Sequence, residues 1–201
     1  MDWLHAIDVW LFLKLNAGAA NGVFDWFMPI ATEVKYLLYI VAPSLAALVV
    51  FGGGKGRSMV LTALILVTIT DQLSSHLLKP LVARERPCHT VELARVLYRC
   101  GKTWSFPSSH AVNAMGAAIF FGLIYRRYLW VFVTVAVINS YSRVYLGIHY
   151  PFDMLCGWLL GMLAAYGMVV VYRRWIMMVL GRWRFFRVTP YVSETGGQDV
   201  A

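Results

Sequence analysis

Three short strings in this 201-residue chain combine the residue types that phosphoryl transfer requires. They are Lys79 to Pro87 (KPLVARERP), Pro107 to His110 (PSSH), and Ser142-Arg143 followed by His149 and Asp153. Together they supply cations, two histidines and a carboxylate at the ends of strongly apolar segments. Cations can bind the oxygens of a phosphoryl group, and an imidazole nitrogen can attack its phosphorus. The inventory therefore predicts transfer of a phosphoryl group to a nitrogen nucleophile.

The third string predicts a histidine that a carboxylate orients. Pro151 suits the first turn of a helix, and a residue that precedes proline avoids the helical region. We therefore expect His149 just outside a helix and Asp153 about one turn inside it. The carboxylate can accept a hydrogen bond from one ring nitrogen and leave the other free to attack phosphorus. The alternative is a helix N-terminus capped by an acid beside an ordinary interfacial histidine, and the other two strings argue against it.

The second string predicts an oxyanion site at the start of a helix. Exposed backbone N–H groups and the positive end of the helix dipole favour an anion there. Ser108 can add a hydroxyl donor with Ser109 beside it, and a protonated His110 can give its proton to the leaving oxygen. The alternative is a plain N-cap formed by proline and serine.

Lys79, Arg86 and Arg143 can supply positive charge to the equatorial oxygens of the transferring group. Their alternative role is anchoring at the membrane edge by snorkelling, and Arg84 fits that role better, so we expect Arg84 outside the site. No metal or cofactor is implied, since the cations are organic. The candidate metal ligands follow no ligand spacing that we recognise: His76, Cys88, His89 and His110.

The composition indicates a membrane protein. The chain is 60% hydrophobic and only 14% charged, with a mean hydropathy of +0.63. This is too apolar for a soluble domain of its size, so we predict an all-α integral membrane protein. The formal net charge of +8 could suggest nucleic acid, but basic residues that flank membrane spans explain it more simply. We expect the bilayer as partner and no nucleic acid; the oligomeric state stays open.

The apolar runs predict a helical bundle of about five to six transmembrane helices. Residues 1–34 hold two apolar stretches that are too short to span a bilayer, which predicts interfacial helices. Residues 35–172 form the predicted membrane domain, and residues 173–201 a basic cytoplasmic tail. The expected spans are 36–52, 58–78, 109–125, 128–147 and 151–172.

Alternation of these spans places all three strings on one membrane face, although they are far apart in sequence. The motif face holds basic residues too, among them Arg95, Arg99 and Lys102. The opposite face carries a basic set with no acid before Glu194: Lys55, Arg57, Arg126, Arg127, Arg173, Arg174, Arg182, Arg184 and Arg187. By the positive-inside rule that face is cytoplasmic, so the strings face the periplasm or the exterior of the cell.

The long connection at residues 79–108 carries two further predictions. Apolar residues recur at helical spacing from Val91 to Tyr98, which predicts a short amphipathic helix at the interface that selects the substrate. The alternative is a surface helix with no selective role. Cys88 and Cys100 flank this segment and are expected to form a disulfide if the loop faces outward; otherwise they are two separate thiols in a cytosolic loop.

Two features inside the spans carry expectations of their own. A charge within a span is costly, so Asp71 either pairs with Arg143 or accepts hydrogen bonds from a helix neighbour. Gly157 and Gly161 form a small-xxx-small face, which predicts close helix packing.

The spacings Lys-x6-Arg-Pro, Pro-Ser-x-His and Ser-Arg-x5-His-x3-Asp resemble the three motifs of the type 2 phosphatidic acid phosphatase (PAP2) superfamily. The family usually has glycine where this chain has Ser109. The resemblance implies that His149 forms a phosphohistidine supported by Asp153 and that His110 protonates the leaving group. It also implies phosphate binding by the motif residues Lys79, Arg86, Ser108 and Arg143, beside which we place Ser109.

These inferences predict a metal-independent phosphatase of the bacterial inner membrane that hydrolyses a lipid phosphate or diphosphate. The resemblance adds undecaprenyl diphosphate, phosphatidylglycerophosphate, phosphatidate and the lipid A 1-phosphate as candidates. Compact length favours the first, whereas Lys79 is more typical of the phosphatidylglycerophosphate and lipid A branches. One alternative is a lipid phosphotransferase that uses the same phosphohistidine. A transporter or scramblase is a third, disfavoured because the polar residues gather at one face.

Overall fold

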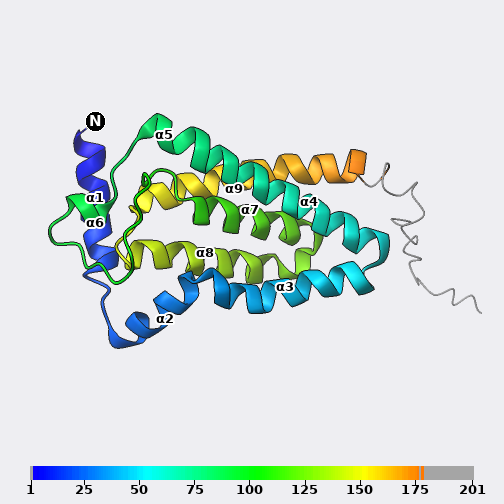
Figure 1. Cartoon of the computed structure of the whole chain (residues 1–201), viewed down its shortest axis with the longest axis horizontal. Coiled ribbons are helices and arrows are strands. Elements are labelled where there is room, and N and C mark those ends of the chain that lie inside the picture. The colour runs from blue at the N-terminus through cyan, green and yellow to red at the C-terminus, as the bar shows by residue number, and fades with distance from the viewer. Residues whose placement is uncertain (1, 177, 179–201) are drawn as a thin grey trace, which may run out of the picture.

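The structure is a computed structural model that describes residues 2–176 and 178. Its described part is helical, and five long helices run side by side (Figure 1). They are α3 (Val34–Phe51), α4 (Gly53–Gln72), α7 (Ser109–Ile124), α8 (Leu129–Tyr145) and α9 (Pro151–Val171). These helices coincide with the five expected spans to within a few residues, which confirms the predicted all-α bundle.

Two stretches, Gly53–Thr90 and Pro151–Arg174, are long and apolar enough to cross a membrane. Leu38–Phe51 and Ser109–Ile124 are shorter apolar helices. A helix of 21 residues such as α9 measures about 30 Å, which is the thickness of the hydrocarbon core of a bilayer.

The centre of the bundle is α7, which packs against α4, α8 and α9. Its contact with α9 is close because glycines remove side chains from the interface. A Cβ atom at Gly157 would lie 2.8 Å from Cβ of Ala111, and one at Gly161 would overlap the carbonyl oxygen of Val112. The structure therefore confirms the predicted close packing at these two glycines, and it fixes the start of α7 against the start of α9.

Helix α4 extends further than the predicted span. It continues through a π-helical turn, η1 (Leu73–Leu78), into α5 (Lys79–Val82). The helix ends at Ala83, which has a left-handed backbone (φ 48°). This extension carries Lys79 to the end of the bundle where the other motif residues lie.

The N-terminal residues form α1 (Asp2–Asn16) and α2 (Gly22–Thr32). Helix α1 lies across one end of the bundle, at a steep angle to the long helices (Figure 1). Its inner face is buried at Asp8, Phe12 and Asn16, whereas Trp3 and Trp10 are exposed. An apolar outer face and a buried inner face at helical spacing are what an interfacial helix requires.

The predicted amphipathic helix after Val91 is wrong. Only a short helix, α6 (Pro87–Thr90), precedes an irregular segment from residue 91 to 108. The backbone there is bound to neighbouring elements: the Asn16 side chain bonds both N–H and C=O of Arg95, and N–H of Leu97 donates to Leu146 O (3.2 Å). A helix would have to give up these bonds. The segment is closed by the predicted disulfide between Cys88 and Cys100, whose Cα atoms are 6.3 Å apart.

The opposite end of the bundle holds the α3–α4 turn, η2 (Arg126–Tyr128) and η3 (Tyr172–Ile176) (Figure 1). Its described basic residues are Lys55, Arg57, Arg126, Arg127, Arg173 and Arg174. The three arginines predicted beyond them, Arg182, Arg184 and Arg187, lie outside the described residues, as does most of the predicted tail 173–201. These six residues therefore lie at the end opposite the motifs, where the sequence places them.

Candidate active site

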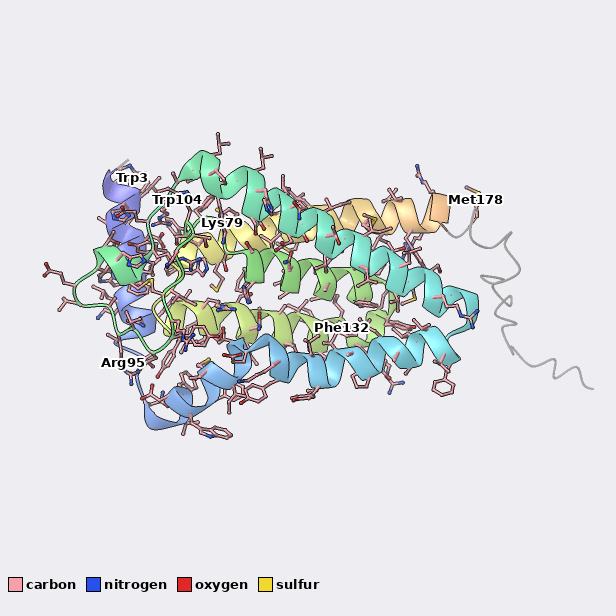
Figure 2. The ribbon with its side chains drawn as sticks, in the orientation of Figure 1. Trp3, Lys79, Arg95, Trp104, Phe132 and Met178 are labelled. Carbon is pink, nitrogen blue, oxygen red and sulfur yellow. A yellow bond between two sulfur atoms is a disulfide. The ribbon has the colours of Figure 1, made fainter. Side chains whose placement is uncertain are left out.

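The structure brings all three motifs to one end of the bundle. Lys79 and Trp104 lie at the end of the bundle that α1 crosses, far from Met178 (Figure 2). The contributing elements are the end of the continuous helix formed by α4, η1 and α5, the start of α6, the start of α7, the end of α8 and the start of α9. The predicted site residues are buried there: Lys79, Arg86, Ser108, Ser109, Arg143, His149 and Asp153, with His110 half-buried.

His149 and Asp153 lie as predicted, on either side of the start of α9. Nδ1 of His149 is 3.4 Å from Oδ2 of Asp153, a distance that makes the contact electrostatic rather than a good hydrogen bond. Burial lowers the pKa of His149 to about 4, although the neighbouring Asp153 carboxylate opposes the shift. The ring is therefore neutral at pH 7, as a nucleophile must be.

Arg86 defines the tautomer of His149. Its Nη1 lies 3.2 Å from Nε2 of His149 and also donates to Ile148 O (3.0 Å), while its Nε donates to Thr103 O (2.7 Å). A guanidinium can only donate, so Nε2 must be the accepting, unprotonated nitrogen. The proton of the neutral ring is then on Nδ1, facing Asp153, and the lone pair of Nε2 faces the cation.

Asp153 is held by several donors. Its Oδ2 accepts a hydrogen bond from Tyr150 N–H (2.9 Å) and another from the Ser105 hydroxyl. Its Oδ1 accepts from Nη1 of Arg84 (2.8 Å). The carboxylate of Asp153 caps the first turn of α9 through Tyr150, and the backbone oxygen of Asp153 accepts a hydrogen bond from Ser108 N–H (3.1 Å). Asp153 therefore joins the starts of α9 and α7.

Arg143 reaches the start of α7 from the end of α8. Its Nη2 contacts Nε2 of His110, and the same nitrogen lies 3.5 Å from Thr32 O. Because arginine cannot accept, Nε2 of His110 is the acceptor in this contact. The guanidinium also lies 5.8 Å from the ring of Tyr98, within the range of a cation–π interaction.

The three predicted phosphate-binding cations are buried without an acidic partner. Lys79, Arg86 and Arg143 are 7%, 7% and 8% exposed, and among the described side chains none of them belongs to an ion pair. The hydroxyl of Ser108 and Nε of Arg143 are likewise buried with no hydrogen-bond partner within that part of the chain. Buried charges and donors of this kind are costly unless an anion compensates them.

Ser109 occupies the position where the family usually has glycine. Its hydroxyl lies 3.1 Å from that of Ser75, so Ser109 joins η1 to the start of α7. Asp71, one turn deeper, does not pair with Arg143 in the structure. It accepts a hydrogen bond from the Asn113 amide on α7 (3.1 Å), and Asn113 in turn accepts from Thr70 (2.7 Å).

Sequence reasoning missed three residues near Asp153. Arg84, expected at the membrane edge, instead bonds Asp153 and Asp8 and is only 20% exposed. Its Arg-x-Arg spacing with Arg86 was the available signal. Ser105 and Asp8 carried no local signal, because both reach the site only through tertiary folding.

One group of potential metal ligands lies beside the site in the described part of the chain: Cys88, His89 and Cys100, with ligand atoms within 4.8 Å of one another. Both sulfurs are used in the disulfide, and His89 Nε2 lies 3.2 Å from Sγ of Cys100. The group therefore offers a metal one imidazole and no thiolate.

Comparisons with known proteins agree with the geometry. The family model of the PAP2 superfamily matches residues 60–177. A lipid A 4'-phosphatase of Bacteroides thetaiotaomicron is 34% identical over 169 residues, which cover 80% of this chain and 75% of that protein. An undecaprenyl-diphosphatase of Sulfolobus acidocaldarius is 33% identical over 75% of this chain and 80% of its own length. The crystal structure of a phosphatidylglycerolphosphate phosphatase from Bacillus subtilis matches with a TM-score of 0.65 at 22% identity, covering 87% of this chain and 88% of that one.

Proposed function

The chain belongs to the PAP2 superfamily and is a phosphatase of that family, and from this premise we propose that it hydrolyses a lipid phosphate through a phosphohistidine at His149. The observation that carries the proposal is the set of three buried cations that have no acidic partner among the described residues and are gathered around a neutral histidine. A dianionic phosphoryl group supplies the missing negative charge. Its oxygens bind Lys79, Arg86 and Arg143 while Nε2 of His149 faces its phosphorus.

In the first step Nε2 of His149 attacks phosphorus and the bond from phosphorus to the lipid oxygen breaks. Asp153 stabilises the positive ring through its contact with Nδ1. The leaving oxygen takes a proton from His110, which must first be protonated. Phosphate bound to Arg143 would draw the guanidinium away from Nε2 of His110 and leave that nitrogen able to carry a proton.

In the second step water attacks the phosphohistidine, His110 accepts a proton from that water, and the P–N bond breaks. The products are inorganic phosphate, the lipid alcohol or monophosphate, and the free enzyme. Three organic cations provide the charge stabilisation that Mg²⁺ provides in many soluble phosphotransfer enzymes. We therefore expect activity that survives chelation.

For the substrate, we propose lipid A phosphates and undecaprenyl diphosphate, because relatives named for these lipids are 34% and 33% identical to the chain. A site at the end of the bundle suits a head group whose tail stays in the bilayer. We place residues 35–172 across the bacterial inner membrane, residues 1–34 at its outer surface and residues 173–201 on the cytoplasmic side. The basic residues at the end opposite the site support this orientation.

The test uses the full chain purified in detergent. It is assayed for phosphate release from lipid A, undecaprenyl diphosphate, phosphatidylglycerophosphate and phosphatidate, with and without EDTA. With ³²P-labelled substrate, protein quenched in alkaline detergent should carry an acid-labile, base-stable label on His149. Release from none of these lipids, or a requirement for a divalent ion, would contradict the proposal; label passed to a second lipid in place of water would make the enzyme a phosphotransferase.

A further inference from the structure

We propose that Arg84 and Asp8 are positioning residues of the reaction: they fix and charge-balance Asp153, which orients His149. This makes the N-terminal helix α1 part of the working site. The inference deepens the proposed function and rests on it. It concerns two residues that are not among the defining positions of the three motifs: Arg84 is one of the unspecified positions of Lys-x6-Arg-Pro, and Asp8 lies in a segment that precedes the bundle.

Arg84 bridges two carboxylates with the two arms of its guanidinium. Nη1 donates to Oδ1 of Asp153 (2.8 Å) and Nη2 donates to Oδ2 of Asp8 (2.7 Å). The guanidinium carbon also lies 3.9 Å from the ring centroid of Tyr150, so the group is stacked as well as hydrogen-bonded. A planar fork held on three sides has one orientation, and it imposes that orientation on Oδ1 of Asp153.

Asp8 is the outer end of this chain of contacts. Its side chain is fully buried, although α1 is otherwise exposed along its outer face. While Oδ2 binds Arg84, Oδ1 accepts a hydrogen bond from Phe152 N–H (2.9 Å) in the first turn of α9. Asp8 therefore fixes Arg84 and the start of α9 together, on either side of Asp153.

Helix α1 has other anchors, so Asp8 is not needed merely to attach it. Phe12 is fully buried and packs edge-on against Tyr150, with ring centroids 5.6 Å apart. Asn16 bonds the backbone of Arg95 and of Tyr145. A buried acid on a helix that is already anchored by packing and by an amide indicates a role beyond attachment.

The arrangement sets the field at His149. The charged and titratable groups that act on its ring are Asp153 on α9, Arg86 before α6, Lys79 on α5 and His110 on α7. Arg84 and Asp8 act through Asp153. Arg84 offsets part of the negative charge of Asp153, and Asp8 offsets part of the positive charge of Arg84. Loss of Arg84 should therefore favour the protonated ring, and loss of the Asp8 charge should disfavour it.

The experiment measures kcat and kcat/KM against pH for Arg84→Gln and Asp8→Asn in the full chain, on one lipid phosphate. Asparagine keeps an oxygen for Phe152 N–H, and Arg84→Lys keeps the charge without the fork. We expect kcat to fall about 10- to 100-fold in Arg84→Gln, with KM changed less than about threefold. The acid limb of the kcat–pH profile should move to higher pH in Arg84→Gln and to lower pH in Asp8→Asn. In Arg84→Lys it should stay near that of the wild type.

Ionisation of the substrate is common to all variants, so it does not produce opposite shifts. The matched charge controls are Arg99→Gln and Glu92→Gln, at exposed positions of the connection 79–108 that also contains Arg84. They should leave the kcat–pH profile unchanged. Two results would overturn the inference. One is a loss of activity that accompanies a lower Tm while the acid limb of the pH profile stays in place. The other is an acid limb that moves in the same direction in Arg84→Gln and in Asp8→Asn. If Asp8→Asn does not fold, the Arg84→Gln and Arg84→Lys pair decides.

The outcome is separable from that of the proposed function. If His149→Ala is inactive and carries no label while Arg84→Gln behaves like the wild type, only this inference fails. If His149→Ala retains phosphate release, the proposed function fails and this inference fails with it.

Discussion

Two sets of cations share the motif end of the molecule, and they differ in what neutralises them. Arg84 pairs with Asp8 and Asp153, and Arg95 forms a bidentate pair with Asp25 (2.6 and 2.5 Å). The second set is buried without an acidic partner among the described residues: Lys79, Arg86 and Arg143. Similar side chains a short distance apart are thus used in two ways.

Under the proposed function, the difference teaches that pairing, not residue type, separates arginines that hold the structure from cations that bind the substrate. Paired arginines have their charge satisfied within the protein and hold segments together: Arg84 joins α1 to α9, and Arg95 joins the long loop to α2. Unpaired cations make the folded state costlier and leave it able to bind an anion. Two of the three pairing acids, Asp8 and Asp25, come from the N-terminal helices, and the third, Asp153, comes from α9. The N-terminal helices therefore help to decide which cations are paired within the protein.

The largest expected effect tests the histidine that the unpaired set surrounds. His149→Ala should lower kcat by about 10⁴-fold or more, because covalent catalysis loses its nucleophile. Phosphate release and ³²P labelling on one lipid substrate measure the change, with His89→Ala as the control on an exposed histidine of the same end. Near-normal turnover by folded His149→Ala protein would show that the unpaired cations do not serve this residue.

The next effect separates the two sets directly. Arg143→Gln should lower kcat/KM by about 10²- to 10³-fold and leave Tm unchanged or raised, because it removes an unpaired buried charge that binds the transition state. Arg95→Gln should lower Tm and change kcat/KM less than about tenfold, because it breaks an ion pair that holds the loop. Kinetics and thermal unfolding in the same detergent measure both. Reversed patterns, with Arg95→Gln the less active variant, would break the comparison.

The sequence predicted the bundle and the motif residues well because both depend on local chemistry. Apolar runs of about 20 residues define spans, and alternation of spans then brings the motif ends together. The disulfide followed from the same topology. The structure brings the motif residues together, and the catalytic and binding roles given to them stay predictions.

The failures share one cause, which is tertiary override of a local pattern. The spacing after Val91 fits a helix, but Asn16 and Leu146 bind the backbone of that segment instead. Arg84 looked like a membrane-edge anchor because its partner Asp8 lies 76 positions away. No periodicity in one segment encodes an acid supplied by another.

A smaller effect concerns acid pH. The folded pKa of His149, about 4, lies below its ordinary 6.5, so between these values the unfolded chain binds more protons. Stability should therefore rise with pH across this window, and be lost as pH falls from 6.5 toward 4. Asp25, whose pKa Arg95 and Tyr145 lower to about 2, keeps its contribution above 3.8 and loses it as pH falls through 2.

Thermal unfolding from pH 7.5 to 4 measures this order. The fall in Tm should be smaller in His149→Ala than in the wild type across pH 6.5 to 4, and unchanged in slope there in Asp25→Asn. Equal slopes in the wild type and in His149→Ala would mean that the buried ring does not control acid stability.

The smallest expected effect concerns the disulfide beside the unpaired set. Cys100 lies three residues before Thr103, whose carbonyl and hydroxyl oxygens both accept hydrogen bonds from Arg86. The Cys88–Cys100 bond closes this segment onto α6 and so keeps Thr103 at Arg86. Cys88→Ser and Cys100→Ser should each lower stability, by up to about 3 kcal/mol in the loop-entropy account, and lower kcat/KM only several-fold, because Arg86 keeps its bond to Ile148. Cys156→Ser, which removes a free thiol in α9, is the control.

Mass spectrometry of protein alkylated in intact cells before lysis measures the bond itself. Serine variants indistinguishable from the control would show that the loop holds Arg86 without the disulfide. Free thiols at both positions would show the same and would also remove one support for a site that faces the outside of the cell.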